Sequence, residues 1–577
     1  MFARYALTFS RGAHRHGLLD AARSRGFATI TDRSGFLLVA DDDIPLLEAQ
    51  DVLVVGQLFS RDGARLTTLG PILASSSTGG ISPPALNRHW GNFVLFDASQ
   101  EQPSLYRDPS GSVPVYHVRH GGEDFFVSDA EFAAGLGLLP DPRVDLTFAI
   151  HWLQFPFLRT RRCGLENVAE ILPGVRYAKE STGAWIERAE WRPSQFLARR
   201  AAIFDPAEAS RRLRETALAT VAPQVTDRNV HLQLSGGLDS SIIAACLSEK
   251  GVEFEGVNFA TRSADGDERR YARDVADSCG VTLRELVESG TPSLEAAAVS
   301  FRPATNPLLL PFQQAIDEAA REAGAGVLVD GAGGDNLFCY ITSAAPILDA
   351  IWWSGPRAGL AAASDIATRA DCTWWRLASA TARRALRQRA RWKEDRSLLR
   401  RGALLGRAEP HPWLEGLPRA LPGKKEHVEA LVHIQHFLDR GATGSIRSLH
   451  PLLAQPLLEL CLQIPSWLWM RGGRDRAIAR DAFHDLLPAS VFARRSKGSL
   501  QGLLHRAFAR LAPEMRDLLH SGELRRHRIL DEPALNRAFA GASELRDDLQ
   551  LRITELVALE LWMQSWRSFD ARRAARP

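Results

Sequence analysis

Two glycine-rich turns hold the residues whose types and spacing could do chemistry. The first lies within HLQLSGGLDSSIIAACLSEKG (231–251), where a short apolar strand runs into a glycine turn and a helix follows. Glycines lack Cβ atoms, so backbone N–H groups can close on an anion there, and the helix start adds partial positive charge. The segment supplies these candidate binding residues: Leu234, Ser235, Gly236, Gly237, Asp239 and Ser240.

Asp239 does not suit direct contact with a phosphate, because carboxylate and phosphate repel each other. A divalent cation between them removes the conflict, and Mg²⁺ prefers carboxylate and phosphate oxygens. The segment is not a Walker A loop, since GK[ST] is missing. We therefore expect a phosphate site in which Asp239 helps to hold Mg²⁺.

The second turn lies within GVLVDGAGGDNLF (326–338). An apolar strand runs into Gly331, Ala332, Gly333 and Gly334, and Asp335 follows. Taken alone, this pattern equally suits an ordinary strand-to-helix turn with a capping aspartate.

The elements that must position these turns change in character along the chain. Residues 1–195 contain short apolar runs (51–59, 92–97 and 124–129) bounded by Gly, Pro, Asp and Ser, which predict a β-rich domain. Between 200 and 340, strand-like runs alternate with helical periodicity, which predicts a parallel sheet with crossover helices. From about 345 onward the sequence predicts mainly helices. We expect two domains, 1–195 and 200–577.

Bulk composition narrows the function classes. The 71 basic and 68 acidic residues nearly balance, which argues against nucleic acid or an acidic membrane as partner. Six scattered cysteines have no metal-type spacing and are too sparse for a disulfide framework, so we expect reduced, mostly buried thiols and a cytoplasmic protein. The apolar stretch Tyr5 to Phe9 is too short for a signal peptide. The most apolar segment, 451–470, is broken by prolines and polar residues, so no membrane span is expected.

SGGLDSS resembles the pyrophosphate-binding loop of the ATP pyrophosphatase superfamily, whose members split ATP into AMP and pyrophosphate. Together with GAGGDNLF and the helix-like DERRYARDVADSCGV (267–281), it resembles asparagine synthetases and β-lactam synthetases. In that family an SGG-D-S loop is followed by G-x-G-S-D, and the two aspartates share the Mg²⁺ ions on ATP. The resemblance implies that Asp239 and Asp335 are catalytic and metal-binding. It also implies that Val257 in the next strand joins the ATP-binding residues.

ARRSKGSL (493–500) resembles the family's R-x-K-G context, in which a lysine stabilises the acyl-transfer intermediate. Lys497 matches that lysine. A lysine directed at developing negative charge in a dry site is where electrostatic catalysis is largest, on the order of 3 kcal/mol per donor. A surface lysine after a helix is the plainer interpretation of the same residue.

The segments 90–118 and 166–177 resemble the class II glutamine amidotransferase domain of asparagine synthetase. The resemblance implies an N-terminal nucleophile-type β-sandwich, followed by an α/β ATP-pyrophosphatase (adenine nucleotide α hydrolase-like) parallel-sheet domain with many helices. The amidotransferase nucleophile is a cysteine that follows the initiator Met. Here Phe2 stands at that position and the first cysteine is Cys163, so we expect no ammonia release by that route.

The variable position of G-x-G-S-D is Glu in asparagine synthetase and Tyr in β-lactam synthetases, where it helps to deprotonate the attacking amine. Here it is Ala332, whose methyl group cannot act as a base. A degenerate amidotransferase half with a working pyrophosphatase loop and G-x-G-G-D-N resembles the lasso peptide cyclases, or macrolactam synthetases.

The resemblance to lasso peptide cyclases implies adenylation of an Asp or Glu side chain of a precursor peptide, followed by attack of the peptide's own N-terminal amine. Ser235, Gly236, Gly237 and Ser240 would hold pyrophosphate, and Gly331 and Gly333 would let the backbone approach the acyl-adenylate. A leader-binding protein and a leader peptidase are the implied partners. The paired tryptophans Trp352–Trp353 and Trp374–Trp375 form either a peptide-holding wall or ordinary core.

Two alternatives stay open. One is another amide ligase of the family, either an ammonia-dependent asparagine synthetase or a small-molecule lactam synthetase. The other is a catalytically dead scaffold that only binds peptide. The basic stretch 382–401 is either a docking surface for an acidic partner or a solvated helix face.

Overall fold

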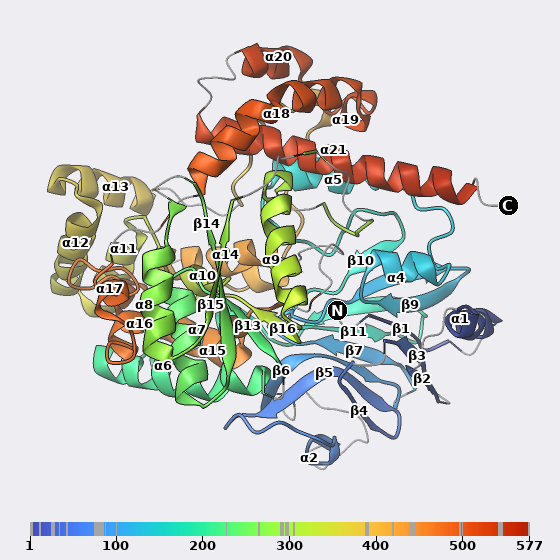
Figure 1. The fold of residues 1–577 in the computed structure, drawn as a ribbon, viewed down its shortest axis with the longest axis horizontal. Coiled ribbons are helices and arrows are strands. Elements are labelled where there is room, and N and C mark those ends of the chain that lie inside the picture. The colour runs from blue at the N-terminus through green and yellow to red at the C-terminus, as the bar shows by residue number, and fades with distance from the viewer. Residues whose placement is uncertain are drawn as a thin grey trace.

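The protein is an α/β molecule with a sheet-rich N-terminal half and a parallel-sheet C-terminal half (Figure 1). The computed structural model describes residues 4–10, 13–24, 29–33, 35–41, 44–73, 86, 88–99, 101–226, 228–262, 266–288, 293–294, 299–303, 306–386, 392–417, 421–438, 446, 448–494, 498, 500–540 and 546–574.

The N-terminal half contains two antiparallel six-stranded sheets, ordered β10-β8-β9-β1-β3-β2 and β12-β11-β7-β6-β5-β4. Its strands are β1 (Tyr5–Thr8), β2 (Thr29–Asp32), β3 (Leu37–Ala40), β4 (Leu46–Ala49), β5 (Val52–Ser60), β6 (His89–Asp97), β7 (Ser104–Arg107), β8 (Tyr116–His120), β9 (Glu123–Val127), β10 (Val168–Glu170), β11 (Val175–Lys179) and β12 (Trp185–Ala189). The three apolar runs read as strands are confirmed as β5, β6 and β9.

A sandwich core forms where the two sheets face each other. Tyr5 and Leu38 of the first sheet pack in one buried cluster with Leu53, Val94 and Phe96 of the second. Alternate residues of the same strands, such as Ala6 and Val39, point to the opposite face of the first sheet. Both faces are therefore buried, which explains why the strands are apolar throughout.

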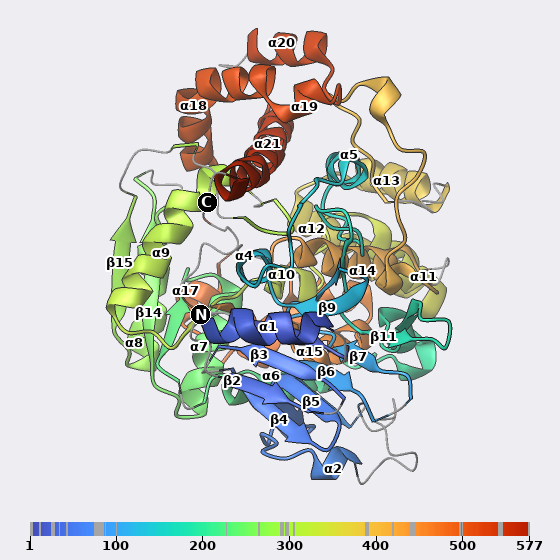
Figure 2. The same ribbon diagram turned by 90° about the vertical axis from the view of Figure 1, so that its right-hand side faces the viewer.

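Helices cover the outer faces of the sandwich: α1 (Ala13–Ser24), α2 (Gly70–Leu73), α4 (Ala130–Gly135) and α5 (Leu146–Gln154). Asp129 caps α4 and Asp145 caps α5 by accepting hydrogen bonds from backbone N–H groups of the first turn. The C-terminal helix α21 (Asp547–Ala574) returns across this half and packs against α5 (Figure 2). The C-terminal helix α21 thus adds to the core of the N-terminal half.

The C-terminal half is built on a parallel sheet ordered β15-β14-β13-β16-β17. Its strands are β13 (Val230–Gln233), β14 (Phe254–Ala260), β15 (Leu283–Val287), β16 (Val327–Val329) and β17 (Ser448–Leu449). From β13 the chain adds β14 and β15 on one side, and β16 begins the other side. The point where the order reverses lies between β13 and β16, and ligands of open α/β sheets bind at such switch points.

The predicted alternation of strand and helix between 200 and 340 is confirmed. The helices of this half are α6 (Pro206–Thr220), α7 (Leu238–Glu249), α8 (Arg269–Cys279), α9 (Leu310–Glu322), α10 (Gly334–Leu337), α11 (Ala345–Ser354), α12 (Pro356–Ala370), α13 (Trp374–Leu386), α14 (Pro422–Gln435), α15 (Gln455–Gln463), α16 (Ala477–Ala482), α17 (Ala489–Phe492), α18 (Gln501–Ser521), α19 (Glu523–Arg526) and α20 (Glu532–Ala540). The fifth strand, β17, was not expected after 345, because two residues are too few to show a periodicity.

Three further expectations can be compared with the structure. The apolar segment 451–470 forms the buried helix α15 with flanking 3₁₀ turns. In the part of the chain that the structure describes, no helix is both long and apolar enough to cross a membrane. All six cysteines are free, and Cys163, Cys246, Cys339 and Cys461 are buried. The domain boundary near 195–200 stays a prediction.

Candidate active site

The two glycine-rich turns meet at a cavity of about 380 Å³ beside the switch point of the parallel sheet. One turn follows β13 and the other follows β16, and these strands are hydrogen-bonded neighbours. The cavity is lined by Gln233, Ser235, Gly237, Leu238, Asp239, Ser240, Asp330, Gly331, Ala332, Asp335, Tyr340, Arg369, Asp475, Arg476, Arg480, Val491 and Arg494.

The first turn needs glycine at Gly236. Its φ is +67°, and a Cβ there would lie 2.5 Å from the Cβ of Tyr271. Gly237 is the N-cap of α7 and has no side chain to bind the free N–H groups of that helix. The Ser235 and Ser240 hydroxyls lie 3.2 Å apart across the turn. Backbone N–H groups and two hydroxyls therefore surround a space suited to an anion.

The second turn packs directly on the first. A Cβ on Gly331 would lie 2.9 Å from the backbone nitrogen of Ser240. A Cβ on Gly334 would lie 2.4 Å from the Cγ of Asp239. Any side chain at these two positions would push the turns apart, so the glycines set the distance between the two loops.

Asp239 and Asp335 converge, as expected, and one guanidinium lies between them. Arg476 Nη1 donates to Asp335 Oδ1 and lies 3.3 Å from Asp239 Oδ1. Arg476 has a left-handed backbone (φ 49°) at the start of α16, and its guanidinium lies 5.3 Å from the centre of the Tyr340 ring. A cation thus bridges the two carboxylates.

The donor set fits Mg²⁺ bound together with a nucleotide. Within the described ranges, no group of three or more His, Cys, Asp or Glu side chains could hold a metal by itself. Mg²⁺ is commonly held by one or two carboxylates, with substrate phosphates completing its shell. Asp239 and Asp335 supply two carboxylates, and the glycine turn supplies the place for phosphates.

A further carboxylate, that of Asp475, organises the arginines of the cavity wall. Arg369 Nε donates to Asp475 Oδ2 at 2.8 Å, and Arg480 Nη2 and Arg476 Nε each lie 3.3 Å from Oδ1. Burial alone would raise the pKa of Asp475, but Arg476, Arg369 and Arg480 together hold it below its ordinary value. Asp475 is therefore ionised and keeps three guanidinium groups at the cavity.

Arg494 lines the cavity and contacts the first glycine turn. Its Nη1 donates to the carbonyl oxygen of Gly236 at 3.2 Å, and its guanidinium stacks 4.0 Å from the Tyr271 ring centre. Glu268 accepts from Arg494 and, at 2.8 Å, from the backbone N–H of Gly498. Glu268 therefore ties Arg494 and Gly498 together beside the glycine turn.

Asp330 stabilises the second turn by hydrogen bonding. Its Oδ1 accepts from the backbone N–H of Ala332 at 3.0 Å and lies 2.7 Å from Nδ1 of buried His450. Ala332 lines the cavity with a methyl group, as the sequence indicated.

Some of the predicted site residues line the cavity, and others are buried behind it. Ser235, Gly237, Asp239, Ser240, Gly331 and Asp335 line the cavity. Leu234 and Val257 are fully buried behind it, where Leu234 N donates to Val257 O at 2.9 Å. Gly333 faces Leu453, with a φ of +86°. Lys497 lies outside the described residues.

The sequence analysis did not predict the four arginines that line the cavity. Arg369, Arg476, Arg480 and Arg494 come from α12, the start and body of α16, and the segment after α17. Gly334 was also missed as the residue that makes room for Asp239. The run RGGRDRAIAR (471–480) contained a signal, since its arginines share a short stretch with Asp475.

The first cysteine of the N-terminal half is not built for nucleophilic attack. Cys163 is fully buried, and its thiol lies 3.2 Å from the carbonyl oxygen of Val168. Burial raises the pKa of the Cys163 thiol to about 12, so the thiolate is absent at neutral pH. Phe2 lies outside the described residues.

Comparison with known proteins identifies the family. Residues 212–564 match the asparagine synthase family. Over 199 residues the chain is 31% identical to the carboxyethyl-arginine beta-lactam-synthase of Streptomyces clavuligerus, covering 34% of this chain and 35% of that protein. The chain thus matches about a third of the length of this curated relative.

Two solved structures give only a weak likeness. One is described as the allosteric regulatory enzyme of purine biosynthesis, and the other as glutamine phosphoribosylpyrophosphate amidotransferase from B. subtilis. They share 10% and 11% identity with this chain, each with a TM-score of 0.23, covering 57% of it and 89% and 90% of their own chains. Because the family match covers more than half of the chain, this protein belongs to the asparagine synthase family.

Proposed function

We propose that this protein is an ATP-dependent, AMP-forming ligase that closes a macrolactam on a peptide. The observation that carries the ligase chemistry is the convergence of Asp239 and Asp335 on one cation beside the glycine turn. With MgATP bound, Asp239 and Asp335 would hold the metal ion, which would supply positive charge to neutralise the phosphates. The hydroxyls of Ser235 and Ser240 and the N–H groups of Gly236 and Gly237 receive the pyrophosphate.

The reaction has two steps. A side-chain carboxylate oxygen of Asp or Glu in the substrate attacks the α-phosphorus of ATP, and pyrophosphate leaves. The N-terminal amine of the same peptide then attacks the acyl carbon, AMP leaves with the C–O bonding pair, and the amine gives up a proton. A prefolded peptide makes this attack intramolecular, where effective molarities reach about 10⁵ M or more.

The arginine wall suits the charges that develop in both steps. Arg369 and Arg480 are held at the cavity by Asp475, so they meet the phosphate without reorganisation. Lys497, which follows Arg494 in the chain and precedes the anchored Gly498, stabilises the acyl-transfer intermediate in this proposal. Gly331 and Gly333 let the backbone approach the acyl-adenylate.

Two features favour a peptide over ammonia as the amine source. The Cys163 thiol is buried and protonated, so it does not serve as a nucleophile for glutamine hydrolysis. We assign that half to a degenerate class II amidotransferase-like domain. Ala332 removes the base position that the ammonia-using relatives would employ.

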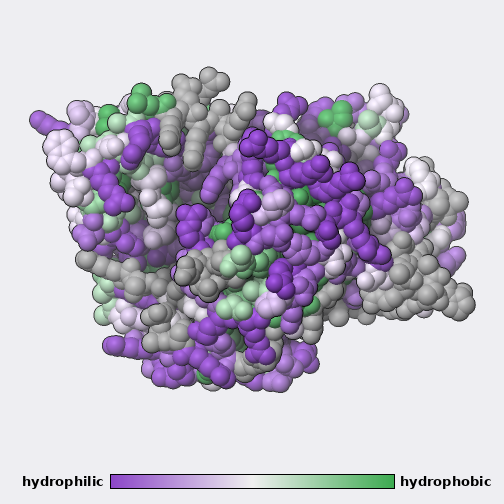
Figure 3. All heavy atoms as spheres, turned by 90° about the horizontal axis from the view of Figure 1, so that it is seen from above, coloured by the Kyte–Doolittle hydropathy of each residue, from purple (hydrophilic) through white to green (hydrophobic). Residues whose placement is uncertain are grey.

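In this proposal, exposed aromatic side chains offer a surface for a peptide. Helix α12 places Arg369 at the cavity wall, and the two helices that pack against α12, α11 and α13, carry exposed Trp352, Trp374 and Trp375. Trp353, by contrast, is half-buried against Trp467 and belongs to the core. The face drawn in Figure 3 is mostly hydrophilic, with apolar residues in small separate groups.

The test is pyrophosphate release by the full chain with MgATP and three substrate sets. The sets are a short peptide with a free amino terminus and an internal Asp or Glu, free aspartate with ammonia, and carboxyethyl-arginine. The peptide is chosen from any short reading frame found beside the gene that encodes an internal Asp or Glu, and any leader-binding protein and leader peptidase found there are added. Pyrophosphate release with the peptide set but with neither of the other two sets, together with loss of one water from the peptide's mass, supports the proposal.

Release with aspartate and ammonia, or with carboxyethyl-arginine, would replace the proposal with a small-molecule ligase. Absence of release from all sets would favour a scaffold that only binds peptide. Asp239→Asn is expected to abolish release, whereas Asp277→Asn, an exposed aspartate of α8, is the matched control and is expected to leave it unchanged.

A further inference from the structure

Helix α13 exposes apolar side chains on the face opposite to its buried face. Its buried face contains Leu377 and Ala380, which pack in an apolar cluster formed mainly by α11 and α12. Arg384 lies on the same side, with its Nε 2.9 Å from Oε1 of Glu426. These three positions of α13 share one side of the helix because they are three, four and seven residues apart. In both ribbon views α13 lies at the edge of the molecule (Figures 1 and 2).

The outward stripe of α13 consists of Trp375, Ser379, Ala382 and Leu386. Their spacing of four, three and four residues places them on one line along the helix, opposite the buried side. Trp375 is 86% exposed and Leu386 is 83% exposed. A surface helix ordinarily turns polar residues to solvent. Scattered exposed apolar residues are common, but two large ones on one stripe form the pattern of a binding face.

Arginines follow one flank of this stripe. Arg376 and Arg383 are both exposed, and each comes one residue after a member of the stripe. Arg384 on the buried side has Glu426 as its partner, whereas Arg376 and Arg383 form no ion pair with any residue that the structure describes. Helix α13 contains no acidic residue. Its outward face is therefore both apolar and positively charged.

The occupant that fits this face is a helix with the complementary pattern. Its apolar side chains pack between Trp375 and Leu386, over the small side chains of Ser379 and Ala382, and carboxylates along its edge pair with the arginines. At 1.5 Å per residue, Trp375 and Leu386 are about 16 Å apart along the helix axis, so about three turns of the occupant cover the stripe.

Two other occupants are less compatible with the charges. If the α13 helices of two copies met face to face, arginines would lie against arginines, because α13 has no carboxylate. An anionic membrane attracts proteins with a clear excess of positive charge. This chain has 71 basic and 68 acidic residues, which nearly balance.

We propose that the outward face of α13 binds an acidic amphipathic helical stretch of the substrate peptide, outside the residues that react. The assignment of this stretch to a substrate rests on the proposed function, whereas the chemistry of the face does not. Binding there anchors the peptide and leaves the chemical step to the residues of the nucleotide cavity. The contact therefore lowers KM for the peptide and has little effect on kcat.

The test measures binding of fluorescent synthetic helical peptides to the full chain without nucleotide. The probes are a Leu/Glu peptide whose leucines share one face, a Leu/Lys peptide of the same pattern, and an Ala/Glu peptide. Saturable binding of the Leu/Glu peptide alone is expected. Absence of saturable binding, or equal binding of all three peptides, overturns the proposal. Preference for vesicles of phosphatidylglycerol and phosphatidylcholine over the Leu/Glu peptide replaces it with a membrane contact.

Charge reversal separates this face from general electrostatic attraction. Arg376→Glu combined with Arg383→Glu is expected to weaken binding of the Leu/Glu peptide about tenfold or more and to create binding of the Leu/Lys peptide. Arg212→Glu combined with Arg510→Glu is the matched control, since these exposed arginines of α6 and α18 give the same change in net charge. The control is expected to bind as the wild type does. An equal loss in both double variants contradicts the proposal.

Trp375→Ala tests the apolar part of the face. Binding of the Leu/Glu peptide is expected to weaken about tenfold or more, because tryptophans that become buried at interfaces are frequent hot spots. Leu551→Ala, which removes an exposed apolar side chain of α21, is the control and is expected to leave binding unchanged. Unaltered binding by Trp375→Ala would show that the stripe does not contact the peptide.

Kinetics with the peptide substrate test the assignment to a substrate. The Arg376→Glu and Arg383→Glu double variant is expected to raise KM for the peptide more than it lowers kcat. An unchanged KM overturns the assignment. Absence of pyrophosphate release with every substrate refutes the proposed function instead, and binding of the Leu/Glu peptide still reports on the face.

Discussion

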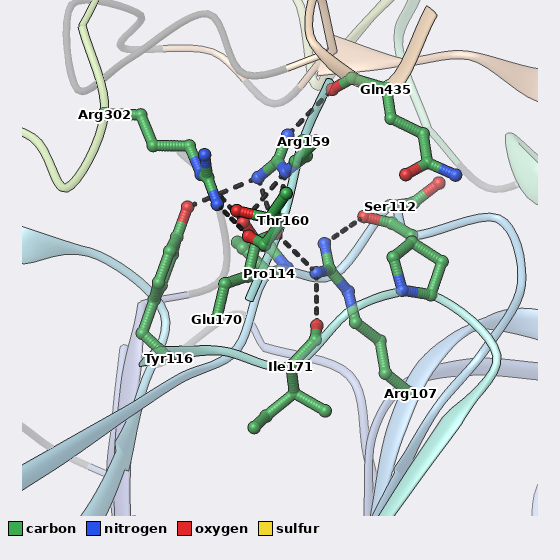
Figure 4. Close-up of polar contacts among 12 residues, drawn as sticks. Arg107, Ser112, Pro114, Tyr116, Arg159, Thr160, Glu170, Ile171, Arg302 and Gln435 are labelled. Atoms are coloured by element: carbon green, nitrogen blue, oxygen red, sulfur yellow. Dashed lines mark hydrogen bonds and ion pairs between the residues drawn. The ribbon is translucent and has the colours of Figure 1, made fainter. Parts of the chain in front are cut away.

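The molecule contains two clusters of arginines and carboxylates that differ in closure. The cluster around Glu170 is buried between the halves, and its carboxylate contacts three guanidinium groups (Figure 4). The active-site cavity is open to solvent and is lined by four arginines and four aspartates, with Asp335 one-third exposed.

The difference in closure determines in which cluster a charged partner can be replaced by another ion. In the sealed cluster, each removed charge leaves a buried partner uncompensated, so the effect of mutation falls on stability. In the open cavity, another cation can replace Arg476 at Asp239 and Asp335. The displaced guanidinium stays paired with Asp475 and is solvated by water. We therefore expect mutations there to affect nucleotide chemistry more than folding.

The largest expected effect is that of Glu170→Gln on stability. Removing the carboxylate leaves three buried guanidinium groups facing one another, and breaking such a pair costs about 3–5 kcal/mol. Urea unfolding measures the change in the free energy of unfolding. Glu208→Gln, which removes an exposed partner of Arg211, is the control and is expected to cost less than about 1 kcal/mol. Similar costs for the two variants would contradict the comparison.

The second prediction concerns Asp335→Asn in the open cavity. Under the proposed function, loss of one preorganised charge at the phosphates lowers the rate by about 10²–10³. Pyrophosphate release in the presence of the active substrate measures it, and thermal unfolding of the same sample reports the fold. A fall in Tm as large as that of Glu170→Gln would show that this cavity is also a structural cluster.

Gly334→Ala sharpens the comparison by changing only the space between the two turns. Its added Cβ would lie 2.4 Å from Asp239 Cγ, so the loops must separate. Overpacking of this kind costs about 1–3 kcal/mol, and we expect weaker binding of MgATP together with a modest loss of stability. Isothermal titration with MgATP checks the first effect. Gly402→Ala, where nothing lies within 4 Å of the new Cβ, should leave both quantities unchanged.

The smallest predicted effect is a loss of stability under mild acid. Burial, with the nearby Lys424, lowers the pKa of His427 to about 3, below its unfolded value near 6.5. Between these values the unfolded chain binds the extra proton, so the free energy of unfolding falls as the pH decreases below about 6.5. Each histidine of this kind contributes up to about 1.4 kcal/mol per pH unit.

Urea unfolding of wild type and His427→Gln over a range from about pH 7.5 to about pH 5 measures this dependence. The variant should show a shallower loss. Glu170, whose pKa is lowered in the fold, remains ionised over this range and contributes no change. Parallel curves for the two proteins would mean that His427 is protonated in the folded state.

Several elements followed from local patterns. SGGLDSS predicted a strand, a glycine turn and a helix, and the structure has β13, Gly236 at φ +67° and α7 in that order. GAGGDNLF likewise predicted the turn after β16. These motifs are readable because a glycine with positive φ and a helix start depend mainly on residues within one turn of the chain.

Other features depended on contacts between distant segments. No local pattern shows that Arg476 bridges residues 239 and 335, or that Gly334 touches Asp239. The strand β17 consists of only Ser448 and Leu449 and exists because β16 offers an edge for pairing. Trp352 and Trp353 are adjacent in sequence, yet Trp353 packs against Trp467 and Trp352 is half exposed.

The amino-acid sequence alone determined the two glycine turns, the pair of aspartates and the division into a sheet-rich and an alternating half, since each rests on short-range spacing and backbone conformation. Only the tertiary structure decided which arginines surround the site and which charges are sealed between the halves. The physical reason is that desolvation and charge pairing depend on distances across the fold, and residues such as Arg107, Glu170 and Arg302 become neighbours only after both halves have packed.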